Sequence, residues 1–175
     1  ADLFADDDPD AARLTIEVLE TVIASTADDT VVRNLVNLSK LGCGTDLDDF
    51  GTGHAAIGNI RRFSIQRVKI DRSFVTGVDR DPDQQNMVSA ILLMAGRLGL
   101  DTLAEGVETA AEHGALARLG CRHVQGYGIA RPMPEGALLR WLEEREKRLP
   151  SPEPPTPSPG LPGTFTASED SGKTP

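Results

Sequence analysis

Cysteine is scarce in this 175-residue sequence, and long apolar runs do not occur in it. Its two cysteines, Cys43 and Cys121, have neither CxxC spacing nor a disulfide framework, so we expect buried free thiols in a reducing, cytoplasmic compartment. No apolar stretch approaches the roughly 20 residues that a membrane-spanning helix needs. The acidic start at Ala1 has neither an initiator Met nor the basic end of a signal peptide. We therefore expect a piece of a longer protein, whose parent could itself be anchored in a membrane.

Basic residues are also few. Lys and Arg number 18 against 27 Asp and Glu, which gives a formal net charge of -9. Proteins that bind nucleic acid polymers neutralise phosphates with a basic surface, so we expect no such polymer as a partner. A small anionic ligand stays open, because a bound metal ion can invert the local field. Neither GxGxxG nor GxxxxGKS/T follows an expected strand, which disfavours a phosphate-binding loop.

What remains has the composition of a globular domain, with 39% hydrophobic and 26% charged residues. The segment 149–175 is rich in Pro and Ser. It cannot bury enough apolar surface to offset its ordering entropy, so we expect it to be disordered. We interpret 1–12 as a linker or a truncated start, and 13–148 as the folded part.

Short β-branched segments alternate along this folded part with segments of helical periodicity. We expect strands over 14–19, 43–47, 67–70, 101–104 and 123–127. We expect helices over 30–40, 52–63, 82–98, 109–119 and 134–148. Repeated β-α units indicate an α/β fold with parallel strands, either an open doubly wound sheet or a (β/α)8 barrel. About five strands are too few to close such a barrel.

The most informative run is Asp48-Asp49-Phe50-Gly51-Thr52-Gly53, at the end of the second expected strand. Two adjacent carboxylates repel and raise each other's pKa unless a cation neutralises them. The glycines that follow allow a sharp turn, which brings a helix start close to the same point. The run indicates a divalent-metal site beside a phosphate pocket. A helix-capping Asp with a solvated neighbour is the alternative.

Polar residues recur at the ends of the other expected strands. In parallel sheets and barrels, the carboxyl ends of the strands converge on one rim, where active sites form. A single charged residue there can be a helix cap or a solvated group, but the whole set favours a functional cleft. Apart from the Asp pair, its members are Glu17, Glu20, Lys69, Asp71, Glu105, Glu108 and Gln125.

The residue types of this rim indicate its chemistry. Oxygen ligands without His or Cys suit Mg²⁺ or Mn²⁺ rather than Zn²⁺. Several carboxylates that share one Asp suit a pair of ions, which can activate a water and stabilise the leaving oxygen in phosphodiester cleavage. A Lys beside them can hold the attacking water or balance charge in the transition state.

Five motifs also occur in the order and spacing of one known family. They are Glu17-Val18-Leu19-Glu20, Asp48-Asp49-Phe50-Gly51-Thr52-Gly53, Val68-Lys69-Ile70-Asp71-Arg72-Ser73-Phe74, Ala104-Glu105-Gly106-Val107-Glu108-Thr109 and Val124-Gln125-Gly126-Tyr127. From about Leu14 to Trp141, the chain resembles the EAL-domain family, the cyclic di-GMP phosphodiesterases of bacterial signalling. The resemblance implies a modified (β/α)8 TIM-like barrel that converts cyclic di-GMP to pGpG with two Mg²⁺ or Mn²⁺ ions.

The resemblance implies roles for the central residues. Glu17, Asp48, Asp49 and Glu105 look like metal ligands, with Asp48 shared between the two ions. Lys69 resembles the catalytic Lys near the attacking water, and Asp49 and Glu105 are expected to take part in catalysis with it.

Four further residues resemble supporting members of the family's site. Glu20 is similar to the Glu that anchors the loop after the Asp pair. Asp71 is expected near Lys69, while Glu108 and Gln125 look like rim residues on the side of the metal water or the substrate.

Departures from the family pattern leave two functions open. The chain contains no Glu-Ala-Leu, and the Asn ligand expected before Glu17 is missing, so it resembles the C-terminal five-eighths of the domain. His54-Ala55-Ala56 replaces the more usual Tyr-Ser-Ser. The first hypothesis is an active phosphodiesterase. The second is a degenerate module that binds cyclic di-GMP or mediates dimerisation.

The isolated 175 residues are expected to have little or no activity, because part of the ligand set is absent. The expected partners are cyclic di-GMP, a second copy of the chain in a homodimer, and an upstream diguanylate cyclase-like or sensor domain.

Overall fold

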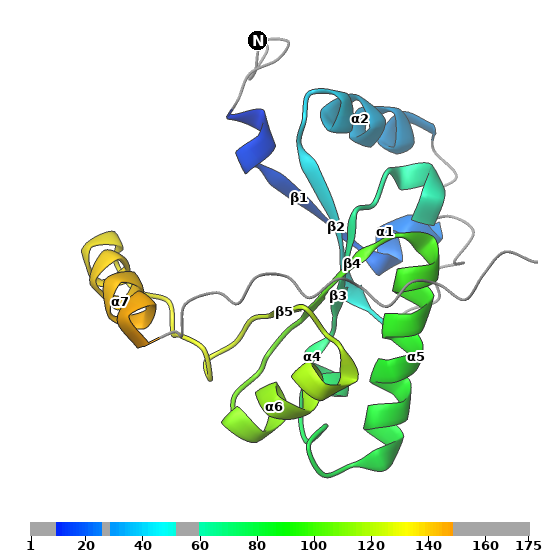
Figure 1. The fold of residues 1–175 in the computed structure, drawn as a ribbon. Coiled ribbons are helices and arrows are strands. Elements are labelled where there is room, and N and C mark those ends of the chain that lie inside the picture. Colours follow the sequence, from blue (N-terminus) through cyan, green and yellow to red (C-terminus); the bar gives the residue numbers. More distant parts are fainter. Residues whose placement is uncertain (1–9, 26–28, 52–59, 149–175) are drawn as a thin grey trace, which may run out of the picture. The chain divides into compact units, whose positions relative to one another are not determined.

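Five parallel strands form one sheet in the order β1-β2-β3-β4-β5 (Figure 1). The structure is a computed structural model and describes residues 10–25, 29–51 and 60–148. The strands are β1 (Thr15–Leu19), β2 (Gly44–Phe50), β3 (Arg67–Ile70), β4 (Asp101–Ala104) and β5 (His123–Val124). Each strand pairs in parallel with its neighbour in the sequence, as successive β-α units require.

Helices connect and cover the strands, and Figure 1 shows α1, α2 and α5 alongside the sheet. The α-helices are α1 (Glu20–Ser25), α2 (Asp29–Lys40), α4 (Arg72–Val75), α5 (Pro82–Leu98), α6 (Ala110–Leu119) and α7 (Glu135–Arg148). Two short 3₁₀ helices are η1 (Ala11–Arg13) and η2 (Arg61–Phe63). No helix among the described residues is both long and apolar enough to cross a membrane.

The chain divides into two compact units, Ala1–Pro132 and Met133–Pro175. The first holds the sheet and the helices from α1 to α6. The second holds α7, in which the guanidinium of Arg145 lies 5.0 Å from the ring centroid of Trp141, a cation–π distance.

The structure confirms most of the elements predicted from the sequence. The strands expected over 67–70 and 101–104 and the helix expected over 82–98 are found with those bounds. Local signals explain α5 well. The Asp81 carboxylate accepts from the Asp83 backbone N–H at 2.9 Å, Pro82 begins the helix, and Gly99 ends it in the left-handed region at φ 73°.

Two strand predictions were wrong in extent. The second strand runs to Phe50 and not to 47, so the Asp pair lies inside β2 rather than after it. The fifth has two residues instead of five, because the chain leaves the sheet at Gly126, where it packs against the Val107 backbone with no room for a Cβ atom. The sequence also gave no sign of the short helices α1 and α4.

Some sequence predictions lie outside the described residues. They are the Thr52-Gly53 turn, the segment His54-Ala55-Ala56, most of the helix expected over 52–63, the start of the expected linker over 1–12, and the tail over 149–175.

The sheet has an apolar face and a polar face, because successive strand residues point in opposite directions. Val18, Leu47 and Val68 are aligned across three strands and are buried on the helix-covered face. Burying each such side chain contributes roughly 1.5–3 kcal/mol. Glu17 and Lys69 alternate with them and therefore point to the other face, which is the interior face of a barrel.

This architecture is that of an incomplete TIM-like barrel, as the sequence predicts. In the described residues, β1 and β5 are the two edges of the sheet and do not pair with each other. The carboxyl ends of the five strands lie at one edge of the sheet, and the polar residues of the interior face gather there.

Candidate metal centre at the strand ends

The ammonium group of Lys69 lies at the centre of the polar residues. Lys69 is on β3 and is only 4% exposed. Its Nζ lies 2.7 Å from Glu17 Oε1, 2.9 Å from Asp48 Oδ1 and 3.0 Å from Glu105 Oε1. These carboxylates come from β1, β2 and the residue after β4, so Lys69 joins four strand ends. An ammonium has three N–H donors, and each has a carboxylate within reach.

The protonation of Lys69 follows from these contacts. Burial by itself would lower the pKa of Lys69, because it disfavours the charged form. Hydrogen bonds to the three carboxylates outweigh burial and raise the pKa above its ordinary value. Lys69 is therefore a fixed positive charge at neutral pH.

Asp48 and Asp49 both reach this centre because β2 is irregular. Leu47 pairs with Val68 and Phe50 with Ile70, so β2 carries one extra residue between those pairs. Asp49 has φ 55°, in the left-handed region, which Asp tolerates better than most residues other than glycine. A β-bulge of this kind re-aims a side chain. As a result, ligand oxygens of Asp48, Asp49 and Glu105 all lie within 4.8 Å of one another.

The donor set of this centre fits a hard divalent cation. Its ligands are carboxylate oxygens, the type that Mg²⁺ and Mn²⁺ prefer. Four ionised carboxylates around one ammonium leave three negative charges to be balanced. Burial and the charges of Asp48 and Asp71 raise the pKa of Asp49. Burial also raises the pKa of Glu105, with Lys69 acting against it. A bound cation would lower the pKa values of both carboxylates, because it favours their charged form.

Glu20 lies outside the ammonium cluster. It is the first residue of α1, it is buried, and its Oε2 accepts from the Gly51 N–H at 2.9 Å. Gly51 has φ 102°, and a Cβ there would lie 2.6 Å from the Phe74 ring. The Glu20 contact therefore holds the end of β2, directly after the Asp pair, at a position that only glycine can occupy.

The structure places Asp71 at the start of α4. Its carboxylate accepts from the Ser73 N–H at 2.9 Å, which caps the helix and lowers the pKa of Asp71. Asp71 is thus a helix cap whose charge also acts on Asp49.

A pocket of about 270 Å³ opens beside Glu105. On its wall, Arg72 Nη2 lies 2.8 Å from Glu108 Oε1, and both side chains are exposed. The ring of Tyr127 is 57% exposed, and the Arg131 guanidinium lies 4.8 Å from its centroid. The pocket is lined by Arg72, Glu105, Gly106, Glu108, Gln125, Gly126 and Tyr127. Gln125 and Glu108 therefore lie together beside Glu105, whereas the ion-pair partners of Lys69 in the described residues are Glu17, Asp48 and Glu105.

Comparison with known protein families shows which family the chain belongs to. The model of the EAL domain family matches residues 1–132. The chain belongs to the EAL domain family. This confirms the family and the TIM-like fold that the five motifs predict.

Individual relatives agree with this family. The chain is 41% identical over 128 residues to the bifunctional diguanylate cyclase/cyclic di-GMP phosphodiesterase MucR of Pseudomonas aeruginosa. The matched region covers 73% of the chain and 18% of MucR. A solved complex of the PaMucR phosphodiesterase with c-di-GMP has a TM-score of 0.67 at 40% identity, covering 73% of this chain and 51% of that one. A manganese/cyclic di-GMP complex of Klebsiella pneumoniae BlrP1 has a TM-score of 0.62 at 30% identity, covering 70% and 31%. The chain thus spans about half or less of these proteins.

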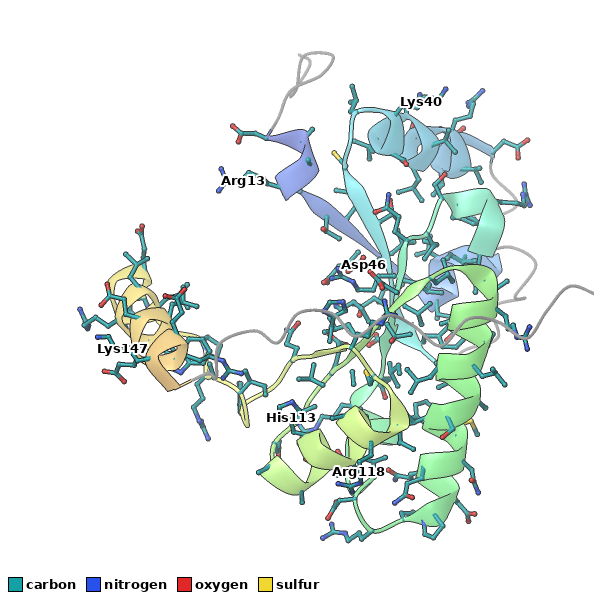
Figure 2. All side chains as sticks on the ribbon, in the orientation of Figure 1. Arg13, Lys40, Asp46, His113, Arg118 and Lys147 are labelled. Atoms are coloured by element: carbon teal, nitrogen blue, oxygen red, sulfur yellow. The ribbon has the colours of Figure 1, made fainter. Side chains whose placement is uncertain are left out.

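The sequence did not reveal a second ion pair on the interior face of the EAL sheet. Asp46, which is labelled in Figure 2, is buried, and its Oδ2 lies 3.6 Å from Arg67 Nη1. Burial raises the pKa of Asp46, while Arg67 acts against this rise. Strand alternation was the available signal, because Asp46 precedes Asp48 by two residues and so shares its face.

Glu112 is another functional candidate that the sequence analysis did not single out. It lies in α6, is 5% exposed and accepts hydrogen bonds from the backbone N–H groups of Gly77, Glu108 and Thr109. The signal was the capping box formed with Thr109, which the sequence shows as Thr followed three residues later by Glu.

Two neutral substitutions of Asp49 differ in how well they tolerate its left-handed backbone conformation. We expect Asp49→Ala to destabilise the EAL domain by about 1–2 kcal/mol more than Asp49→Asn, because Ala adopts the left-handed region at a cost that Asn largely avoids. Urea unfolding of the full-length gene product without divalent metal measures the difference. Equal stability of the two variants would contradict the left-handed bulge.

Removal of the Lys69 ammonium group makes the free energy of unfolding depend on pH in a predictable direction. In metal-free protein at pH 7, we expect Lys69→Met to cost about 2–3 kcal/mol, because it leaves partly buried carboxylates without a counter-charge. The pKa values of these carboxylates then rise in the folded state, so the loss is smallest below about pH 4, the ordinary range of carboxylates, and grows as pH increases. In the wild type, the contribution of Lys69 persists up to its unfolded pKa near 10.4 and is lost only at higher pH.

The control for Lys69→Met is Arg62→Met. Arg62 pairs with Asp29 at 3.2 Å on an exposed surface, so we expect a change of at most about 0.5 kcal/mol without pH dependence. Urea unfolding at several pH values distinguishes the two variants. A loss for Lys69→Met that is the same at pH 4 and pH 7 would show that the carboxylates do not depend on Lys69.

Proposed function

We propose that the EAL domain containing this chain hydrolyses cyclic di-GMP to linear pGpG. The observation that carries the proposal is the buried Lys69 ammonium with three carboxylates within 3.0 Å, beside the oxygen group of Asp48, Asp49 and Glu105. Such a centre suits metal-assisted phosphodiester cleavage. The names of MucR and of the BlrP1 complex support the same substrate and a divalent metal.

The proposed cofactor is a pair of Mg²⁺ or Mn²⁺ ions. Glu17, Asp48, Asp49 and Glu105 would hold them, with Asp48 shared between the two. Ions held there would supply activation of a water and stabilisation of the leaving oxygen of the phosphodiester.

The side chains of the centre supply orientation, charge and proton transfer. Because its pKa is raised, Lys69 donates hydrogen bonds and does not accept a proton at neutral pH. We assign to it the orientation of the attacking water and the stabilisation of negative charge on the phosphoryl oxygens. Asp49 and Glu105 bring carboxylate oxygens to the same group, so we assign to them the acceptance of a proton from that water.

The surrounding residues support this centre. Glu20 fixes the end of β2, and Asp71 fixes the start of α4. Glu108, Gln125 and Tyr127 line the pocket beside Glu105, which is the proposed position of the nucleotide part of the substrate.

We also propose a cytoplasmic location, the cyclic dinucleotide as ligand, and no nucleic acid polymer as partner, in line with the net charge of -9. A homodimer and an upstream diguanylate cyclase-like or sensor domain complete the proposal. The name of MucR, which joins a cyclase to a phosphodiesterase, supports the second of these.

A non-catalytic module that binds cyclic di-GMP is the second candidate. The observation that favours it is His54-Ala55-Ala56, which replaces the more usual Tyr-Ser-Ser after the Asp pair. The two candidates differ in turnover, and not in binding.

The decisive measurement is conversion of cyclic di-GMP by the full-length gene product with Mg²⁺ or Mn²⁺, followed by chromatography of the product. We expect pGpG to form, EDTA to abolish turnover, and Glu105→Gln to lower kcat by about 10²-fold or more, as loss of a charged group at a transition state does. Arg62→Met is the matched surface control and should leave turnover unchanged. Binding of the ligand without any turnover would favour the non-catalytic module.

The isolated 175-residue chain should behave differently from the full-length gene product. We expect no measurable hydrolysis, since it covers only 51% of the solved PaMucR chain and its described sheet has five strands. Chromatography under the same conditions checks this. Turnover comparable to that of the full-length protein would refute it.

A further inference from the structure

The loop that carries Glu105 is tied to its surroundings at almost every residue. The Glu105 N–H donates to Ile70 O at 3.1 Å, which joins the loop to β3. The Val107 N–H donates to Gln125 O at 3.0 Å, which joins it to the chain after β5. The next two N–H groups, of Glu108 and Thr109, donate to a single side chain.

That side chain is Glu112, in the first turn of α6. Its Oε2 accepts from the N–H groups of both Glu108 and Thr109 at 3.0 Å. Its Oε1 accepts from the Gly77 N–H, also at 3.0 Å. Gly77 lies in the turn that follows α4, so one buried carboxylate joins the connection after β3 to the connection after β4.

The ionisation of Glu112 fits this position. Burial would raise the pKa of Glu112, but the three backbone hydrogen bonds together lower it. The side chain is therefore a carboxylate with acceptor capacity on both oxygens, which a neutral amide does not have.

A second contact joins the same two connections on the outside. Arg72 pairs with Glu108 at 2.8 Å, and its side chain lies so close to Gly106 that a Cβ there would collide with it. This pair is exposed and contributes little. We call the three buried hydrogen bonds of Glu112, with Gly77, Glu108 and Thr109, the Glu112 clamp.

We propose that Glu112 is a positioning residue of the active site: through the backbone of Glu108 and Gly77, it holds the Glu105 loop against the turn between α4 and α5, so that the Glu105 carboxylate stays at Lys69 and the Asp pair. The metal-related part of this inference rests on the proposed function. Glu112 itself does not contact the centre and acts only through the loop.

Thr109 offers a matched control within the same capping box. Its Oγ1 accepts from the Glu112 N–H at 3.1 Å and so caps α6, whereas the Gly77 N–H donates to the Glu112 carboxylate. Thr109→Ala therefore weakens the helix end and leaves the Glu112 clamp intact. Glu112→Ala removes all three hydrogen bonds. Glu112→Gln keeps one acceptor oxygen, which can still serve the N–H groups of Glu108 and Thr109. Its NH₂ group cannot accept a hydrogen bond from the Gly77 N–H, so that bond is lost.

The first test is amide hydrogen exchange in the metal-free full-length gene product. We expect Glu112→Ala to speed exchange of the Glu105 and Val107 amides by about tenfold relative to Thr109→Ala, because only the first variant frees the loop. Glu112→Gln should fall between Glu112→Ala and the wild type. Equal exchange in the two Ala variants would overturn the inference.

The second test is calorimetric titration with Mn²⁺. Loss of a partner that orients a metal ligand typically costs about 10–100-fold in affinity, and Glu112 acts one step further away, so we expect about a tenfold loss for Glu112→Ala. Thr109→Ala should bind as the wild type does, and Glu112→Gln should recover part of the loss. Unchanged affinity in Glu112→Ala would overturn the inference. A wild type that does not bind Mn²⁺ would instead refute the proposed function, while the exchange experiment still decides whether Glu112 holds the loop.

Discussion

The structure of this rim depends on one buried ammonium group. The interior face of the sheet places Glu17, Asp48 and Glu105 on neighbouring elements, where they would repel one another in a partly buried environment. Lys69 makes this arrangement stable because its three N–H donors match three carboxylates at 2.7 to 3.0 Å. The lysine is held by β3, whose Val68 and Ile70 pack into the apolar core, so the charge cannot move towards solvent.

The remaining carboxylates of the rim differ in the groups that donate hydrogen bonds to them. Glu20 and Glu112 accept backbone N–H groups, and each fixes a segment that carries site residues. Asp71 caps α4, and Glu108 pairs with an exposed Arg. Acidic residues that look equivalent in the sequence therefore divide into those that face Lys69, those that hold backbone and those that face solvent. The first kind shares one ammonium group among three carboxylates.

Much of this could be predicted from the sequence. Alternating periodicity predicts the strands, and the convergence of parallel strand ends predicts that Glu17, Asp48, Lys69 and Glu105 lie together. Two features could not be found in this way. The bulge at Asp49 depends on a register shift against β3, and pairing register is not visible in one strand alone. The clamp at Glu112 depends on Gly77, which is 35 residues away, and no local pattern links the two.

The bulge and the ammonium together explain how the rim can be negative and still ordered. In a regular β2, Asp49 would point away from Asp48, and the centre would lose one ligand oxygen. The left-handed turn at Asp49 prevents this, and the Glu20–Gly51 contact holds the chain immediately after it. Lys69 takes one oxygen each from Asp48 and Glu105, and a carboxylate has a second oxygen that can serve a cation. The ammonium therefore fixes the direction of these carboxylates without using their full capacity, and a divalent cation that binds there meets ligands whose ordering cost has already been met by folding.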